Sequence, residues 1–133
     1  MVHLDEIKKR LFSFDKNTFP AGKMVAAVAI LGKTLWIGNN NYKSHPSMIK
    51  KFRNGSENSC CHAEVAAIAK VPRQSRHKVE LYVVRFTRDG NVSMAKPCNL
   101  CQNFLKENKI NLHNVYYSDW EWNGHWKRLK EIN

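Results

Sequence analysis

Two short motifs constrain this chain more than any other feature of its sequence. The first is Cys61-His62-Ala63-Glu64, and the second is Pro97-Cys98-Asn99-Leu100-Cys101. His62, Cys98 and Cys101 together supply three protein ligands for a zinc ion and leave its fourth tetrahedral position open for water, as in catalytic rather than structural sites. Glu64 stands two residues from His62, where it can meet that water without being a ligand. Its predicted role is therefore that of a general acid and base.

The setting of the motifs makes the metal interpretation specific. A lone C-x-x-C pair is also typical of a redox pair or of half a structural zinc site. Here Pro97 precedes Cys98, the two Cys lie at i and i+3 at the start of a predicted helix over 99–106, and His62 opens another over 63–70. Residues at i and i+3 share a helix face, and thiolates are favoured at a helix N-terminus. Two helix starts are thus predicted to converge on one metal.

Other Cys and His residues leave alternatives open. Cys60 and Cys61 stand beside His62 and could complete a closed four-ligand site, which would abolish catalysis. The other interpretation is that they are buried core thiols. The remaining histidines have no partner at ligand spacing and are interpreted as surface or loop residues: His3, His45, His77, His113 and His125.

Length and charge narrow the class of protein. The 133 residues suit one domain, 1–133, with one core. No stretch approaches the roughly eighteen apolar residues of a membrane span, and no apolar leader is seen, so we expect a soluble cytoplasmic protein without a membrane partner. Four Cys fit a reducing compartment. The net charge of +11 favours polyanionic partners such as nucleotides or single-stranded nucleic acid, although it could serve solubility alone.

The hydrophobic pattern predicts a mixed α/β domain. Residues 42–59 form a long, polar, basic loop before the first motif, a candidate rim for substrate entry. After the last predicted strand too few residues remain for a parallel crossover, so the sheet is expected to end antiparallel. The predicted elements are a helix over 4–12, strands over 24–31 and 34–39, the helix over 63–70, a strand over 79–86, the helix over 99–106, a strand over 114–118 and a hairpin return over 120–132.

With these motifs in this order, the chain resembles the cytidine/deoxycytidylate deaminase superfamily. The resemblance includes the hairpin over 24–40 and both motifs, and so spans nearly the whole chain. It implies a three-layer α/β/α sandwich around a five-stranded mixed sheet, with the last two strands antiparallel. It also implies Zn²⁺ held by His62, Cys98 and Cys101, with Glu64 as the proton carrier.

The resemblance further implies substrate contacts. Family members hold the base carbonyl with the backbone N–H at the position of Ala63, and Asn40 resembles the Asn that they place on the sugar, although Asn39 and Asn41 leave that register open. Lys96 departs from the family, because its cationic side chain, before Pro97, hints at a nearby phosphate. The tight corner at Pro97 and Cys98 suits a pyrimidine better than a purine.

The hypothesis from the sequence is a zinc-dependent deaminase that converts the cytosine base of a free nucleoside or nucleotide to uracil and releases ammonia. A homo-oligomer is compatible with it. One alternative is a deaminase acting on cytosine or adenine in single-stranded DNA or RNA, suggested by the aromatic and basic residues over 120–128. The other is a non-catalytic nucleic-acid-binding module that uses zinc only to fold.

Overall fold

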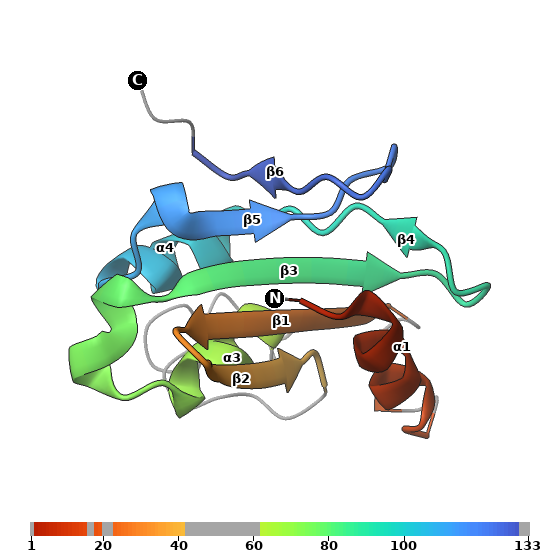
Figure 1. Ribbon diagram of the computed structural model, residues 1–133, viewed down its shortest axis with the longest axis horizontal. Helices are drawn as coiled ribbons and strands as arrows, with labels where there is room; N and C mark the ends of the chain where they lie inside the picture. Colours follow the sequence, from red (N-terminus) through yellow and green to blue (C-terminus); the bar gives the residue numbers. More distant parts are fainter. Residues whose placement is uncertain (1, 16–17, 20–22, 42–61, 131–133) are drawn as a thin grey trace.

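The computed structural model describes residues 2–15, 18–19, 23–41 and 62–130. Within these ranges no helix is long and apolar enough to cross a membrane. The helices and strands fall close to their predicted positions (Figure 1). In chain order they are α1 (Leu4–Phe12), β1 (Met24–Leu31), β2 (Thr34–Asn39), α3 (Ala63–Lys70), the 3₁₀ helix η4 (Arg73–Lys78), β3 (Glu80–Phe86), β4 (Val92–Ser93), α4 (Asn99–Glu107), the 3₁₀ helix η5 (Leu112–Asn114), β5 (Val115–Tyr117) and β6 (Lys127–Arg128).

The strands form one mixed sheet in the order β2-β1-β3-β5-β6, with β4 paired to the end of β3. β1 is antiparallel to both β2 and β3, β3 is parallel to β5, and β6 returns antiparallel to β5. The antiparallel ending is therefore confirmed. The sheet has six strands where five were predicted, because the two-residue β4 adds an antiparallel pair, Phe86 with Val92 and Arg85 with Ser93.

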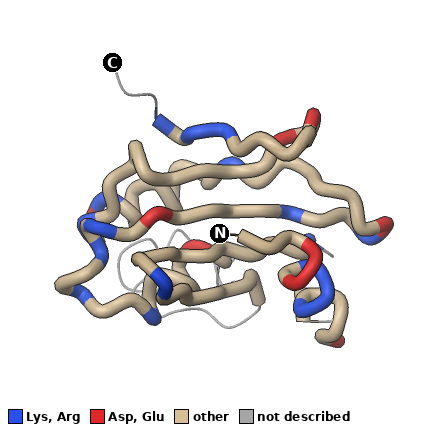
Figure 2. Tube along the Cα trace, viewed as in Figure 1, with Lys and Arg blue, Asp and Glu red and all other residues tan. Residues whose placement is uncertain are grey.

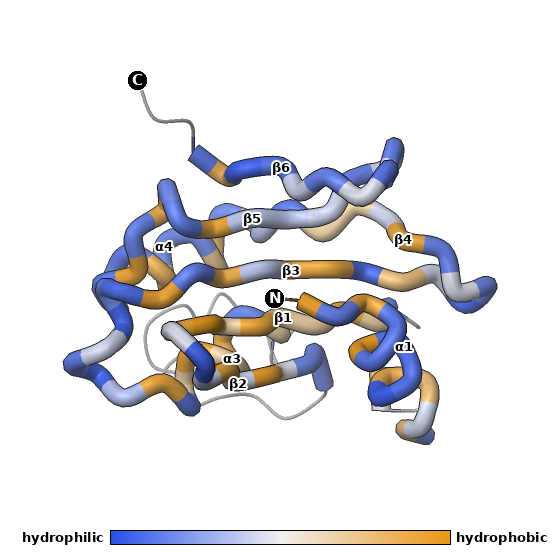
Figure 3. Tube along the Cα trace, viewed as in Figure 1, coloured by the Kyte–Doolittle hydropathy of each residue, from blue (hydrophilic) through white to orange (hydrophobic). Residues whose placement is uncertain are grey.

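Helices cover the sheet on both faces and make three layers (Figure 1). Along β1, Ala27 and Ala29 point into a core shared with α3 and α4, whereas Ala26 and Val28 point into a second core shared with α1. A strand buried on both faces reads as a continuous apolar run. Figure 3 shows apolar residues along β1, β3 and α3. The first core lies between these strands of the sheet and α3.

The sheet and α3 approach one another most closely at Gly38 in β2. A Cβ at this position would lie 2.4 Å from the backbone nitrogen of Ala67 and 2.8 Å from the Cβ of Ala66. The small residues of α3 and the missing side chain at Gly38 therefore let the helix lie against the strand. Because His62 immediately precedes α3, this contact also fixes where the first motif sits.

Replacing Gly38 by Ala is expected to lower the free energy of unfolding by about 3 kcal/mol, near the upper end for overpacking, because the clash is with backbone. Thermal unfolding of the purified variant measures this. Gly32→Ala is the matched control: Gly32 has φ 60°, and a Cβ there would meet nothing within 4 Å, so it carries only the left-handed backbone cost of about 1–2 kcal/mol. Equal losses in the two variants would contradict the close packing at Gly38.

Aromatic side chains occupy the α1 face of the sheet over β3 and β5. Tyr82 and Tyr116 stack with ring centroids 4.9 Å apart, and Trp126 meets Tyr82 edge to face at 5.1 Å. Trp122 meets Trp126 at 4.9 Å, also edge to face. These two tryptophans thus pack around tyrosines of the strands, on the face opposite the α3 and α4 layer.

Candidate active site

The motif residues that the structure describes lie at the starts of α3 and α4. His62 is the residue before α3 and Cys98 the residue before α4, and both have extended backbone conformations. Helix starts leave backbone N–H groups without partners inside the helix, which favours anionic groups there. α3 and α4 pack side by side against the same face of the sheet. Their N-terminal ends thereby bring together residues more than thirty positions apart in the chain.

His62, Cys98 and Cys101 converge as one cluster of donor atoms, all within 4.8 Å of one another. The Nδ1 atom of His62 lies 3.0 Å from the Cys101 sulfur and 3.9 Å from the Cys98 sulfur. Zinc bond lengths of about 2.3 Å to sulfur and 2.0–2.1 Å to nitrogen, at tetrahedral angles, place such donors about 3.6 Å apart. The observed separations lie on either side of that value, so the nitrogen and the two sulfurs fit Zn²⁺.

The two thiols differ in how readily they lose a proton. A hydrogen bond from Cys101, and then one with His62, lower the pKa of Cys98 to about 4 despite the opposing effect of burial. The same hydrogen bond with Cys98, together with burial, raises the pKa of Cys101. A bound cation would hold both sulfurs as thiolates, because metal binding to thiols releases their protons.

Glu64 is the one charged residue of the core among the described residues, with 5% of its surface exposed. It lies in the first turn of α3, next to the cluster, and its side chain hydrogen bonds to Cys101. Burial raises the pKa of its carboxyl above the ordinary value for glutamate. A carboxyl with a raised pKa exchanges protons nearer neutral pH, which is what a general acid and base requires.

Ser118, at the end of β5, holds the approach to the second motif in place. It is fully buried, and its hydroxyl donates to the carbonyl of Ser93 at 2.8 Å. Its own carbonyl accepts from the backbone N–H of Ala95 at 2.9 Å. Further along, the side chain of Gln102 donates to the carbonyl of Pro97 at 2.9 Å. These bonds fix the segment that delivers Cys98 to the cluster.

Comparison with known protein families supports the zinc site that the His and Cys donors indicate. The family of the cytidine and deoxycytidylate deaminase zinc-binding region matches residues 9–118 of this chain. The chain belongs to this family. A solved structure of a Glu-to-Gln mutant cytidine deaminase from Mycobacterium tuberculosis matches with a TM-score of 0.52 and 16% identity, over 97% of this chain and 93% of that one. At that identity the likeness shows the fold. No curated protein matches significantly.

The residues predicted from the sequence to contact the substrate differ in position and burial. Ala63 begins α3 and is buried, so its N–H is one of the first-turn donors without a partner inside the helix. Pro97 is buried and Lys96, just before it, is exposed. These settings are compatible with the predicted roles of Ala63, Lys96 and Pro97, which stay predictions.

Both polar atoms of the Asn40 side-chain amide form hydrogen bonds with the backbone. Its Oδ1 atom accepts from the N–H of Val25 at 3.1 Å, and its Nδ2 atom donates to the carbonyl of Lys23 at 2.7 Å. In this structure Asn40 therefore ties the end of β2 to the start of β1. Its contact with a sugar stays a prediction, and it requires at least one of these bonds to open.

Several predicted features lie outside the described residues. These are Cys60, Cys61, His45 and the long basic loop over 42–59. The structure therefore leaves both alternatives for the two cysteines open, the inert core thiol and the fourth ligand.

Arg85 was missed as a functional candidate. It alternates along β3 with Val83, whose side chain faces the α3 and α4 core, so it points to the same face as the metal cluster. Its Nε atom is buried and has no hydrogen-bond partner among the described residues. A buried donor without a partner calls for an explanation. The sequence signal was an arginine inside the run from Leu81 to Phe86, where it is the one charged residue.

Proposed function

We propose that this deaminase converts the cytosine base of a free nucleoside or nucleotide to uracil with release of ammonia, and that it favours the monophosphate. The observation that carries the proposal is the convergence of His62, Cys98 and Cys101 at two helix starts with Glu64 buried beside them. Three zinc ligands and a separate carboxyl are the groups that hydrolytic removal of a base amine needs.

In this mechanism His62, Cys98 and Cys101 would hold the zinc, which would supply Lewis-acid activation of water near neutral pH. Glu64 accepts a proton from the attacking water, whose oxygen forms a bond to the amine-bearing ring carbon. Glu64 passes this proton to the ring nitrogen, then takes the second proton from the same oxygen, which becomes the carbonyl of uracil, and gives it to the amine; the C–N bond breaks and the amine leaves as ammonia. The N–H of Ala63 holds the base carbonyl, and the corner at Pro97 suits a pyrimidine better than a purine.

Two cationic side chains near the site support the proposal that the substrate carries a phosphate. The ammonium of Lys96 is exposed directly before the Pro97 and Cys98 corner. Arg85 lies on the site's face of the sheet, opposite Val25 and Ser93, with a donor that has no partner among the described residues. Val25 in turn contacts Asn40, the predicted sugar residue. A monophosphate near the sugar would meet both cations.

Ammonia release from a substrate panel tests this function. The panel holds cytidine, deoxycytidine, their mono- and triphosphates, and short oligonucleotides containing cytosine or adenine. We expect kcat/KM to be highest for a cytosine monophosphate, with modest salt dependence because one phosphate is contacted. A protein that holds zinc but releases no ammonia from any of these compounds would favour the non-catalytic module instead.

The second candidate, a deaminase of single-stranded nucleic acid, is favoured by the aromatic surface over β3 and β5. Arg128 lies 5.4 Å over the ring of Tyr116, and Trp120 is 69% exposed, an arrangement suited to stacking bases. Tyr82 and Tyr116 face away from the metal cluster, however, so a docked strand would have to pass round the sheet to reach Glu64. This candidate predicts that an oligonucleotide outperforms every mononucleotide and that log affinity falls with log salt by about 0.7 per phosphate contacted.

A further inference from the structure

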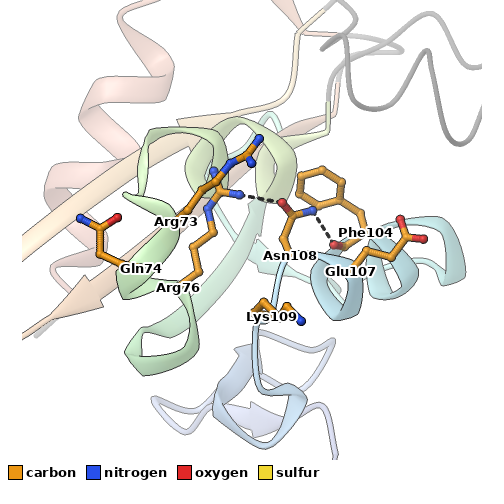
Figure 4. A pocket seen from close by; sticks show the side chains of 7 residues that line it. All are labelled: Arg73, Gln74, Arg76, Phe104, Glu107, Asn108 and Lys109. Atoms are coloured by element: carbon orange, nitrogen blue, oxygen red, sulfur yellow. Dashed lines mark hydrogen bonds between the residues drawn. The ribbon is translucent and has the colours of Figure 1, made fainter.

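A basic cleft lies at the ends of α3 and α4 that are far from the metal cluster. It has a volume of about 490 Å³ and is lined by Arg73, Gln74, Arg76, Phe104, Glu107, Asn108 and Lys109 (Figure 4). Ligand pockets in proteins span roughly 300–1,000 Å³. The helices of the site run for eight and nine residues, so at about 1.5 Å per residue the cleft lies about 12 Å from the cluster. It is therefore separate from the deaminase site.

Two arginines of η4 share one side of the cleft. Residues at i and i+3 of a 3₁₀ helix eclipse one another, which places the side chains of Arg73 and Arg76 together. Figure 4 shows the two guanidinium groups close to each other beside Asn108. Burial, and then the charge of Arg73, lower the pKa of Arg76. Two like charges that meet in a partly buried place favour an anion between them.

Hydrogen bonds hold the inner guanidinium in a fixed position. The Nε of Arg76 donates to the carbonyl of Val71 at 3.0 Å, and its NH1 donates to the Oδ1 of Asn108 at 2.6 Å. Asn108 in turn donates to the carbonyl of Phe104 at 2.8 Å. Joining the ends of α3 and α4 accounts for these bonds of Arg76, because Val71 and Asn108 are the C-cap residues of those helices, but it does not account for Arg73 beside it. A guanidinium that is already immobilised loses little entropy when it binds an anion.

Charge in the cleft is only partly balanced. Arg73, Arg76 and Lys109 bring three cations and Glu107 one carboxylate. Among the described residues neither arginine is in an ion pair, and Figure 4 shows the carboxylate of Glu107 directed away from the guanidinium pair. Figure 2 shows Lys and Arg positions gathered at this end of the molecule.

Lys109 reaches the cleft from a strained backbone position. It follows α4 with φ 68°, the left-handed conformation in which helix ends usually place Gly. The N–H of Ile110 donates to the carbonyl of Leu105 at 2.9 Å, which completes this type of helix end. A lysine at this position is less stable than a glycine would be, but it adds a cation to the cleft. A non-glycine residue in the left-handed conformation is a reason to look for a function.

We propose that this cleft binds a ligand with two or more linked phosphates, held by the guanidinium groups of Arg73 and Arg76 and the ammonium of Lys109. Guanidinium forks match phosphate oxygens in pairs. The cleft, with a volume of about 490 Å³, is too large for one phosphate alone. The phosphates can belong to a free polyphosphorylated compound or to the backbone of a single strand.

Calorimetric titration of the zinc-loaded protein with tripolyphosphate tests the site without involving deamination. We expect Arg73→Gln to weaken binding at least tenfold, and Arg88→Gln, which removes the same charge from an exposed turn outside the cleft, to change it less than twofold. Lys109→Gly should also weaken binding, while its thermal midpoint rises because Gly relieves the backbone strain. The loss of affinity in Lys109→Gly therefore cannot come from unfolding.

A second titration with oligothymidylate, which has no base amine to remove, identifies the source of the phosphates. Tighter binding of tripolyphosphate assigns a free ligand, and tighter binding of oligothymidylate, equally sensitive to Arg73→Gln, assigns a strand. Absence of tripolyphosphate binding, or equal losses in Arg73→Gln and Arg88→Gln, would overturn the proposal. Neither result would bear on the deaminase site, whose activity is measured separately with the cytosine substrates.

Discussion

Replacing Glu64 by Gln is expected to lower kcat for cytosine deamination about 10²- to 10⁴-fold while zinc content and fold are kept. The amide has nearly the shape of the carboxyl but cannot accept the proton of the attacking water or return it to the base. The loss should fall on kcat more than on KM, because the interaction is made in the transition state. Steady-state ammonia release, together with metal analysis of the same preparation, measures it.

Glu80→Gln is the matched control for this variant, since Glu80 is an exposed glutamate at the start of β3. It makes the same chemical change away from the cluster and should leave kcat unchanged. Turnover of Glu64→Gln close to the native rate would remove Glu64 from the mechanism.

Removing any one of the three metal ligands is expected to abolish both zinc binding and activity. His62→Ala, Cys98→Ser and Cys101→Ser each leave two ligands, too few to hold the ion against water and chelators. The native protein should contain about one zinc per chain and these variants almost none. Because zinc binds the folded state, a chelator should lower the thermal midpoint of the native protein but not that of the variants.

Cys60→Ser is the control for the ligand set, because Cys60 lies beside the first motif and is not assigned to the metal. It should keep its zinc and its activity. Full zinc in Cys101→Ser, with the zinc lost instead in Cys60→Ser, would contradict the assignment of the ligands.

The elements that carry the cluster could be predicted because each is encoded locally. The continuous apolar run over 24–31 is a strand buried on both faces. The i and i+3 spacing of Cys98 and Cys101 at the start of α4 does bring both sulfurs to His62, which precedes α3. The antiparallel return of β6 to β5 was also predicted. In each case short-range pattern and tertiary packing agree.

Features that depend on distant contacts could not be read from the chain. The two residues of β4 pair with β3 in a segment that is also held by Ser118, about 25 residues away, and nothing in their own sequence indicates a strand. The basic segment after Pro72 lies between two predicted elements and has no prediction of its own, and it forms η4, which aligns Arg73 with Arg76. The side chain of Asn40 is bound to backbone at β1, which its position after a strand does not reveal.

The aromatic residues near the C-terminal end show the same limit. The aromatic and basic residues over 120–128 suggested stacking against the bases of a single strand. Trp122 and Trp126 instead pack around Tyr82 and Tyr116 on the sheet, because the register of β5 and β6 places these rings on one face. That register is set by pairing between strands and has no signal in local composition.

The most direct test of the account is to measure zinc content and ammonia release from a cytosine monophosphate on one preparation of the native protein. We predict about one zinc per chain and stoichiometric conversion of the cytosine base to uracil, lost when a chelator removes the metal and regained when zinc is added back. A fully zinc-loaded, folded protein that releases no ammonia from any cytosine nucleoside, nucleotide or oligonucleotide would contradict it.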